Sequence, residues 1–161
     1  MSVDLHGKIP EKVKNILGCQ SDEELDIGIF ISTISSDGRP HFAMLSPFQT
    51  VISKTHSLYI SLYSNSQTTK NLKERHKGTI AFTVPPSSFY MAADFSLVIL
   101  SSFNNSLPDH SLFIGTMASV QEDYSQSAPI YSTVRFREDK IKESYSNERM
   151  KLCEAVEELE K

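Results

Sequence analysis

The stretch from Tyr59 to Thr83 constrains the fold of this chain more than any other. Residues 58–62 have the β-branched and aromatic composition of a strand, and Gln67–His76 has the composition of a helix that Gly78 terminates. Thr79–Val84 then predicts a second buried strand. A polar turn therefore opens a helix between two strands.

Four short polar side chains cluster where this helix begins: Ser66, Gln67, Thr68 and Thr69. The first turn of a helix carries backbone N–H groups without internal partners and the positive end of the helix dipole, so it binds phosphate readily. Hydroxyl and amide side chains add neutral donors. The alternative is ordinary N-capping, with Ser66 closing the helix and Thr68 merely lying in its first turn. The two roles are compatible.

Length and composition indicate one globular domain with a single core. The 161 residues are 39% hydrophobic and 22% charged, and the net charge of −4 offers no global attraction for nucleic acid or an anionic membrane. The N-terminal residues lack the apolar core of a signal peptide, and apolar runs such as Leu97–Leu100 are far shorter than a membrane span. We therefore expect a cytoplasmic protein.

The two cysteines, Cys19 and Cys153, lie far apart in the sequence and do not have the spacing of a metal site. In a reducing compartment, two free thiols are the default expectation, and one disulfide between them is the alternative.

The rest of the chain reads as short strands between turns. Asp37-Gly38 predicts a hairpin, the segment 89–100 is ambiguous between strand and helical turn, and 101–111 has the composition of a loop. Further strands are expected at 26–34, 40–45, 48–52, 112–121 and 129–137, and the terminal helices at 10–17 and 148–160 with Ser146 as N-cap. The glycine within 112–121 suggests a bulge or a close approach. This order predicts a mainly β (α+β) barrel closed with help from a helix.

The segment Ile27–Val84 resembles the FMN-binding split-barrel family related to pyridoxamine 5'-phosphate oxidase. The likeness is carried by the strand Ile29–Thr33 before Asp37-Gly38-Arg39-Pro40, the strand Leu58–Ser61, the turn Ser66-x-Thr68-x-x-Asn71-Leu72, and the strand Thr79–Thr83. Gly115-x-Met117-Ala118-Ser119-Val120 loosely resembles the family's G-x-A-x-V strand.

This resemblance implies a six-stranded antiparallel split barrel with flanking helices, assembled as a homodimer that holds flavin mononucleotide (FMN) in clefts between the subunits. The domain would cover 1–161, with the N-terminal helix in 1–20, the barrel over 26–137 including a helix at 66–77, and the C-terminal helix over 146–160. The same resemblance implies that Ser66, Gln67, Thr68 and Asn71 bind the phosphate. It implies that the isoalloxazine ring contacts Ala43, Met44, Leu45 and Ser46, and that Ser61 and Leu62 make further cofactor contacts.

The chain also departs from the family. Oxidase-type members carry basic side chains at the phosphate turn and at the position of Ala43, whereas this turn has Gln67 and Thr68, and the oxidase's C-terminal substrate-binding segment has no match. Oxidation of pyridoxamine phosphate is therefore not the expected activity. The expected function is an oxidoreductase passing electrons from a reduced nicotinamide to a small acceptor. The alternative is a non-catalytic protein that binds flavin or the deazaflavin F420. Metal, haem and nucleic acid are not expected ligands.

Overall fold

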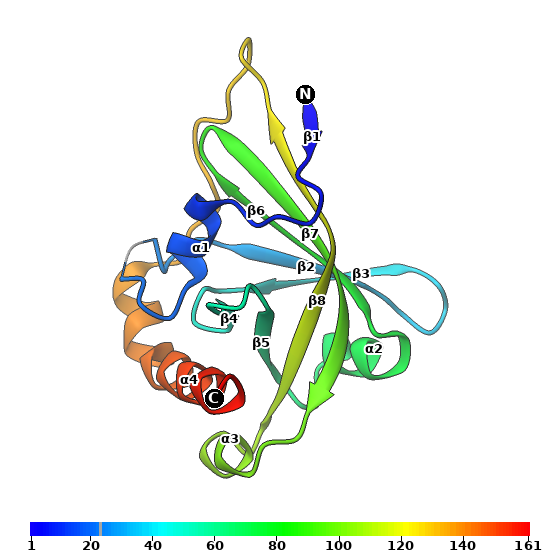
Figure 1. Cartoon of the computed structure of the whole chain (residues 1–161), viewed down its shortest axis with the longest axis vertical. Helices are drawn as coiled ribbons and strands as arrows, with labels where there is room; N and C mark the ends of the chain where they lie inside the picture. Colours follow the sequence, from blue (N-terminus) through cyan, green and yellow to red (C-terminus); the bar gives the residue numbers. More distant parts are fainter. Residues whose placement is uncertain (23) are drawn as a thin grey trace.

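The computed structural model describes residues 1–22 and 24–161 as an antiparallel sheet with four helices (Figure 1). The strands are β1 (Ser2–Asp4), β2 (Ile29–Ile34), β3 (Pro40–Leu45), β4 (Thr50–Ile52), β5 (Leu58–Tyr63), β6 (Lys77–Val84), β7 (Ser87–Val98) and β8 (His110–Tyr124). The helices are α1 (Glu11–Leu17), α2 (Gln67–Arg75), α3 (Ser101–Ser106) and α4 (Glu138–Leu159).

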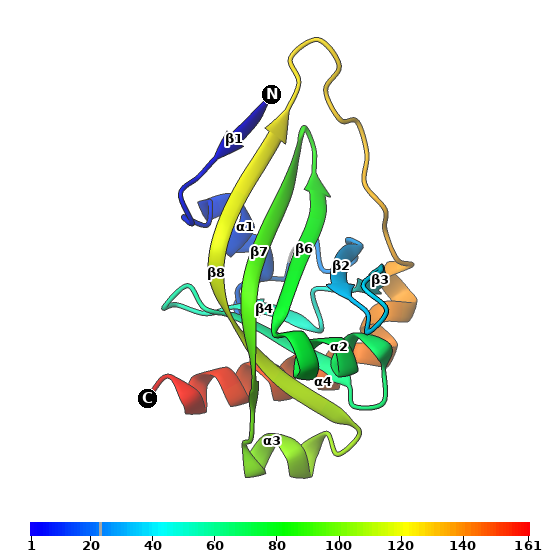
Figure 2. The ribbon, with the colours of Figure 1, turned by 90° about the vertical axis from the view of Figure 1, so that its right-hand side faces the viewer.

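The sheet has the order β3-β2-β6-β7-β8-β5-β4, with β1 paired to β8, and every pair is antiparallel. Its two outer strands, β3 and β4, are consecutive in the chain, so the sheet curls into a half-barrel. Strands β6, β7 and β8 form a long twisted ribbon, and α4 lies across the lower half of the molecule, above α3 (Figure 2). The expected antiparallel, curled architecture is confirmed. The expected count of six strands is wrong, since the sheet of the described residues has eight.

One strand expected in the second half of the chain is not formed. The strand expected at 129–137 is wrong: this segment forms only an isolated bridge between Ile27 and Arg135, and Tyr131 is 95% exposed. Alternating apolar residues predicted a strand, but β8 already pairs on both sides with β7 and β5 or β1, so the segment instead returns along the outside to α4 (Figure 2).

The helices follow local signals at most ends. Gly18 ends α1 and Ser66 caps α2 as expected. Helix α4, however, begins at Glu138, and Ser146 lies inside it with its hydroxyl donating to the carbonyl of Lys142. Ion pairs between side chains one turn apart, such as Lys142–Glu138, support these first turns, and Ile141 packs into a small apolar cluster.

The loop expected at 101–111 contains the short helix α3. The side chain of Phe103 is buried there, and packing of that ring outweighs a loop-like composition. The ambiguous segment 89–100 forms most of the strand β7.

The core lies inside the curl of the sheet. Its fully buried side chains include Ile29, Ile31, Leu58, Ile60, Leu72, Ile80, Phe95 and Phe113. A second cluster docks α4 onto β5 through Leu152, Ala155 and Val156. This docking places the first turns of α4 beside the ends of β3 and β5, where the candidate site lies.

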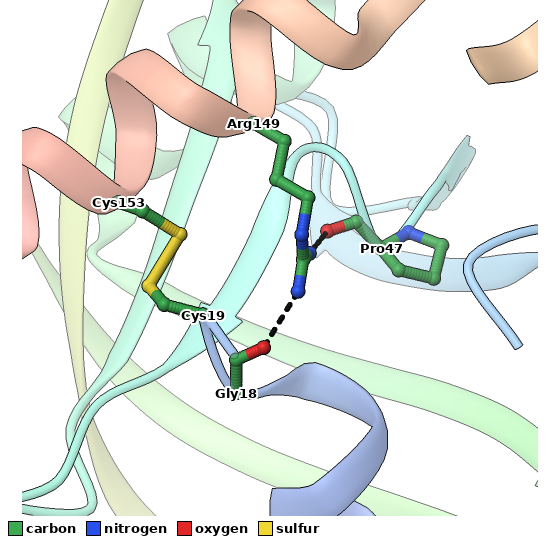
Figure 3. Close-up of a disulfide and its surroundings, with 5 residues drawn as sticks. All are labelled: Gly18, Cys19, Pro47, Arg149 and Cys153. Carbon is green, nitrogen blue, oxygen red and sulfur yellow. Dashed lines mark hydrogen bonds between the residues drawn. A yellow bond between two sulfur atoms is a disulfide. The ribbon is translucent and has the colours of Figure 1, made fainter. Parts of the chain in front are cut away.

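The two cysteines are joined, so the default expectation of free thiols is wrong and the alternative holds. Cys19 follows α1 and Cys153 lies on α4, with their Cα atoms 5.7 Å apart (Figure 3). Folding brings together two residues that are 134 positions apart in the sequence, which no local signal could show. Among the described residues, no helix has the length and apolar character needed to cross a membrane.

Candidate functional site

A pocket of about 230 Å³ lies where the end of β3, the start of α2 and the start of α4 meet. It is lined by Ala43, Met44, Leu45, Ser46, Gln49, Leu62, Tyr63, Ser66, Thr68, Phe136, Ile141 and Tyr145. Seven of the ten residues predicted as cofactor contacts belong to this lining: Ala43, Met44, Leu45, Ser46, Leu62, Ser66 and Thr68. Three segments separated in the sequence therefore converge on one cavity.

The start of α2 shows the N-cap that the sequence predicted and leaves two backbone N–H groups free beside it. The Ser66 hydroxyl accepts a hydrogen bond from the Thr69 N–H at 3.1 Å and donates to the Thr69 hydroxyl at 3.0 Å, which is an N-cap. The N–H of Lys70 already donates to the Ser66 carbonyl. The N–H groups of Gln67 and Thr68 therefore have no intrahelical partner. The Thr68 side chain is buried and lines the pocket.

Ser46, which also lines the pocket, carries a buried polar atom without a partner in the described part of the chain. Within the described residues, its buried hydroxyl oxygen has no hydrogen-bond partner. Thr50 has a similar orphaned hydroxyl but does not line the pocket. A buried hydroxyl without a partner costs free energy, so Ser46 marks a place where a polar ligand atom would be stabilised.

The other three predicted contacts lie outside the pocket lining. Ser61 is fully buried, and its hydroxyl donates to Glu148 at 3.1 Å. The Asn71 amide donates to the Thr33 hydroxyl at 2.9 Å and accepts from Gln67 at 2.8 Å. These contacts hold helices α4 and α2 to the sheet. Ser61 and Asn71 therefore position the helices that line the pocket and do not line it themselves.

A polar cluster that the sequence did not reveal begins in the wall of the pocket and continues to His110 and Glu148. Tyr63 and Tyr145 both line the pocket, and the rings of Tyr63 and His110 lie 4.5 Å apart. His110 Nε2 is 3.2 Å from a carboxylate oxygen of Glu148, and both side chains are at least 90% buried. No partner was expected for His110, because Glu148 lies 38 positions away on α4 and no local pattern links the two residues. Tyr145 and Glu148 fall on the face of α4 that also buries Leu152.

The electrostatics of the pocket are neutral. Its lining contains no Lys, Arg, His, Asp or Glu among the described residues. Partial burial raises the pKa of Tyr63 above its ordinary value, and the nearby Tyr145 and Glu148 raise it further. The phenol therefore stays protonated at neutral pH and can donate a hydrogen bond.

A second, larger groove of about 1060 Å³ runs between α1, the turn at Ser53–His56 and the end of α4. It contains none of the ten predicted cofactor contacts. The smaller pocket is therefore the candidate cofactor site, because the predicted residues and the orphaned hydroxyl meet there.

The comparisons with known proteins agree with this fold. No protein-family model and no curated protein matches the sequence. A candidate pyridoxamine 5'-phosphate oxidase from Lactobacillus delbrueckii superposes with a TM-score of 0.58 at 13% identity, covering 73% of this chain and 97% of that one. A second candidate oxidase, from Listeria innocua, superposes with a TM-score of 0.53 at 13% identity, covering 71% of this chain and 98% of that one. The chain has the fold of pyridoxamine 5'-phosphate oxidase-like split barrels. A structure described as an F420 reductase superposes with a TM-score of 0.53 at 11% identity, covering 70% of this chain and 98% of that one.

Proposed function

We propose that this protein binds a flavin-type cofactor, FMN or alternatively F420, in the pocket between β3, α2 and α4. The observation that carries the proposal is the meeting of seven predicted contacts around an orphaned buried hydroxyl, that of Ser46. The structural neighbours support the same ligand class, because one is described as an F420 reductase and others as candidate pyridoxamine 5'-phosphate oxidases.

The residues present fit such a cofactor. The free N–H groups of Gln67 and Thr68, with the Thr68 hydroxyl, would hold the phosphate, and Ala43–Ser46 would contact the ring, with Ser46 as a hydrogen-bonding group. The pocket volume of about 230 Å³ is below the roughly 300–1,000 Å³ of ordinary small-molecule sites. We therefore propose that a second copy of the chain completes the site in a homodimer.

When bound, the flavin supplies hydride and electron transfer, here proposed to run from a reduced nicotinamide to a small acceptor. The protein supplies placement and exclusion of water. Phe136 and Ile141 cover the pocket with apolar surface, and Tyr63 offers a protonated hydroxyl at its edge. A non-catalytic flavin or F420 binder would use the same residues without turnover.

The binding test is a titration of the purified protein with FMN and with F420, followed by flavin absorbance through gel filtration. Ser46→Ala and Thr68→Val should each weaken binding about 3- to 10-fold, the value of one hydrogen bond. Thr50→Val is the matched control, because it removes the other orphaned buried hydroxyl but lies outside the lining. Absence of binding of either cofactor at micromolar concentration, or an equal loss for Thr50→Val, would refute the site.

Catalysis and assembly need separate measurements. Stopped-flow reduction of the bound flavin by NADH or NADPH, followed by turnover with an acceptor, distinguishes the oxidoreductase from the binder. Light scattering at micromolar protein tests the dimer. A monomer that binds FMN with full affinity would contradict the shared site but leave flavin binding intact.

A further inference from the structure

The Cys19–Cys153 bridge lies at the wall of the larger groove. Cys19 lines this groove of about 1060 Å³, and both cysteines are only half-buried. A thiol entering the groove would therefore meet Cys19 in its wall. This differs from a bridge sealed inside a core, which only unfolding would expose.

The two chain segments that carry the cysteines are held together by other contacts as well. On α4, the buried side chains of Leu152 and Val156 flank Cys153 in the apolar cluster against β5. The Arg149 guanidinium donates to the carbonyl of Gly18 at 2.6 Å and to the carbonyl of Pro47 (Figure 3). Gly18 directly precedes Cys19, and Arg149 lies on the same helix as Cys153. The Arg149–Gly18 hydrogen bond therefore ties the backbone next to Cys19 to the helix that carries Cys153. The two thiols would therefore stay adjacent after reduction.

Arg149 also places a positive charge at the carbonyl of Gly18, the residue before Cys19. Its side chain is buried, and within the described residues its hydrogen bonds go to backbone carbonyls and none to a carboxylate. Burial lowers the pKa of Arg149, an effect that the charge of Asp22 opposes. An arginine remains charged under ordinary conditions even so. A cation beside a sulfur stabilises its thiolate, and a stabilised thiolate is a better leaving group.

We propose that Cys19–Cys153 is a reversible redox couple that exchanges with a dithiol entering the groove, and that Arg149 is its positioning residue. The attacking thiolate bonds to the Cys19 sulfur, the Cys19–Cys153 bond breaks, and Cys153 leaves as a thiolate that takes up a proton. The second thiol of the reductant then attacks the mixed disulfide and releases Cys19. Two electrons and two protons pass from the dithiol, which becomes a disulfide, to the protein.

The first test measures reduction of the wild-type protein by dithiothreitol in native buffer, with thiols alkylated at intervals and counted by mass spectrometry. We expect the rate to rise linearly with dithiol concentration, the circular dichroism to stay native, and oxidised dithiothreitol to restore the bridge. A rate that levels off at the unfolding rate, or a bridge reduced only in denaturant, would show a structural cross-link and overturn the proposal. Neither outcome depends on cofactor binding, so this test can fail or succeed independently of the flavin-binding test.

The second test concerns Arg149. Arg149→Met keeps the aliphatic stem and removes the charge, and it should slow native reduction about threefold if the leaving thiolate loses stabilisation worth about one pKa unit. Arg149→Lys keeps a cation and should recover most of the rate. Arg75→Met, on the exposed side of α2, is the matched control. Equal reduction rates for Arg149→Met and Arg149→Lys would show that the charge of Arg149 has no part in the exchange. If Arg149→Met does not fold, the comparison of Arg149→Lys with wild type and the first test still decide the proposal.

Discussion

The side-chain amide of Asn71 donates a hydrogen bond to the Thr33 hydroxyl across 2.9 Å, and both side chains are buried. This bond joins α2 to β2. On its other side, the Asn71 oxygen accepts from Gln67 at 2.8 Å, one helical turn earlier. Asn71, one of four residues that the family pattern assigned to phosphate, therefore anchors the helix whose first turn reaches the pocket.

We predict that Asn71→Ala lowers the free energy of unfolding by about 1–3 kcal/mol, because it leaves the Thr33 hydroxyl buried without its partner. Urea unfolding measures the change, and Asn105→Ala, exposed on α3, serves as the control. In a Thr33→Val background the same substitution should cost much less. An equal cost in both backgrounds would show that the bond does not couple the two elements.

Local signals predicted the ends of elements well. Ser66 caps α2, Gly18 ends α1, and Gly38 turns the hairpin between β2 and β3 with a positive φ of 85°. Each of these depends on a backbone group or a backbone angle within a few residues, so the sequence contains the whole cause. The pocket residues at 43–46 and 66–68 were found for a related reason, because they flank strands and a turn that the sequence defines.

What the sequence did not predict depends on distant contacts. The bridge between Cys19 and Cys153, the pairing of Glu148 with His110, and the early start of α4 all arise where α4 docks on the sheet. No periodicity near His110 reveals a carboxylate 38 positions away. The candidate site was predicted on its β3 and α2 sides and missed on its α4 side for this reason.

The glycine inside β8 supports a second prediction. A Cβ built on Gly115 would lie 2.8 Å from the ring of Phe95, its partner across the strand pair. The expected close approach is thus confirmed, while the bulge of this strand lies opposite Ala92 and Ala93. Gly115→Ala should destabilise the protein by about 1–3 kcal/mol through overpacking. Thermal unfolding measures this, with the neighbouring exposed Thr116→Ala as control. Adding Phe95→Leu should make the glycine substitution nearly neutral; an undiminished cost would place the strain elsewhere.

Alkaline pH should weaken the junction between β5 and the end of α4. Burial raises the pKa of Tyr59 above its ordinary value, and Glu160, which accepts from its hydroxyl at 3.5 Å, raises it further. A group with a raised folded-state pKa contributes stability that is present below its unfolded pKa of about 10 and is lost as pH rises through the folded value. Tyr59→Phe should therefore flatten the fall of Tm above about pH 10. Tyr131→Phe, at a 95% exposed position, should leave the fall unchanged. Identical pH profiles for wild type and Tyr59→Phe would contradict the assignment.

The neutral pocket leads to a prediction about ligand charge. Because no lysine or arginine is found among the described residues that line it, the phosphate of FMN would be held by neutral donors, which bind about half as strongly as charged ones. FMN and riboflavin should then differ less than about tenfold in Kd, with weak dependence on salt.

Gln67 is exposed at the first turn of α2, beside Ser66 and Thr68. Gln67→Arg should strengthen FMN binding by about tenfold and leave riboflavin unchanged, whereas Gln67→Glu should weaken FMN alone. Fluorescence titration with both flavins measures these values. A change of equal size for FMN and riboflavin would place the phosphate away from the start of α2.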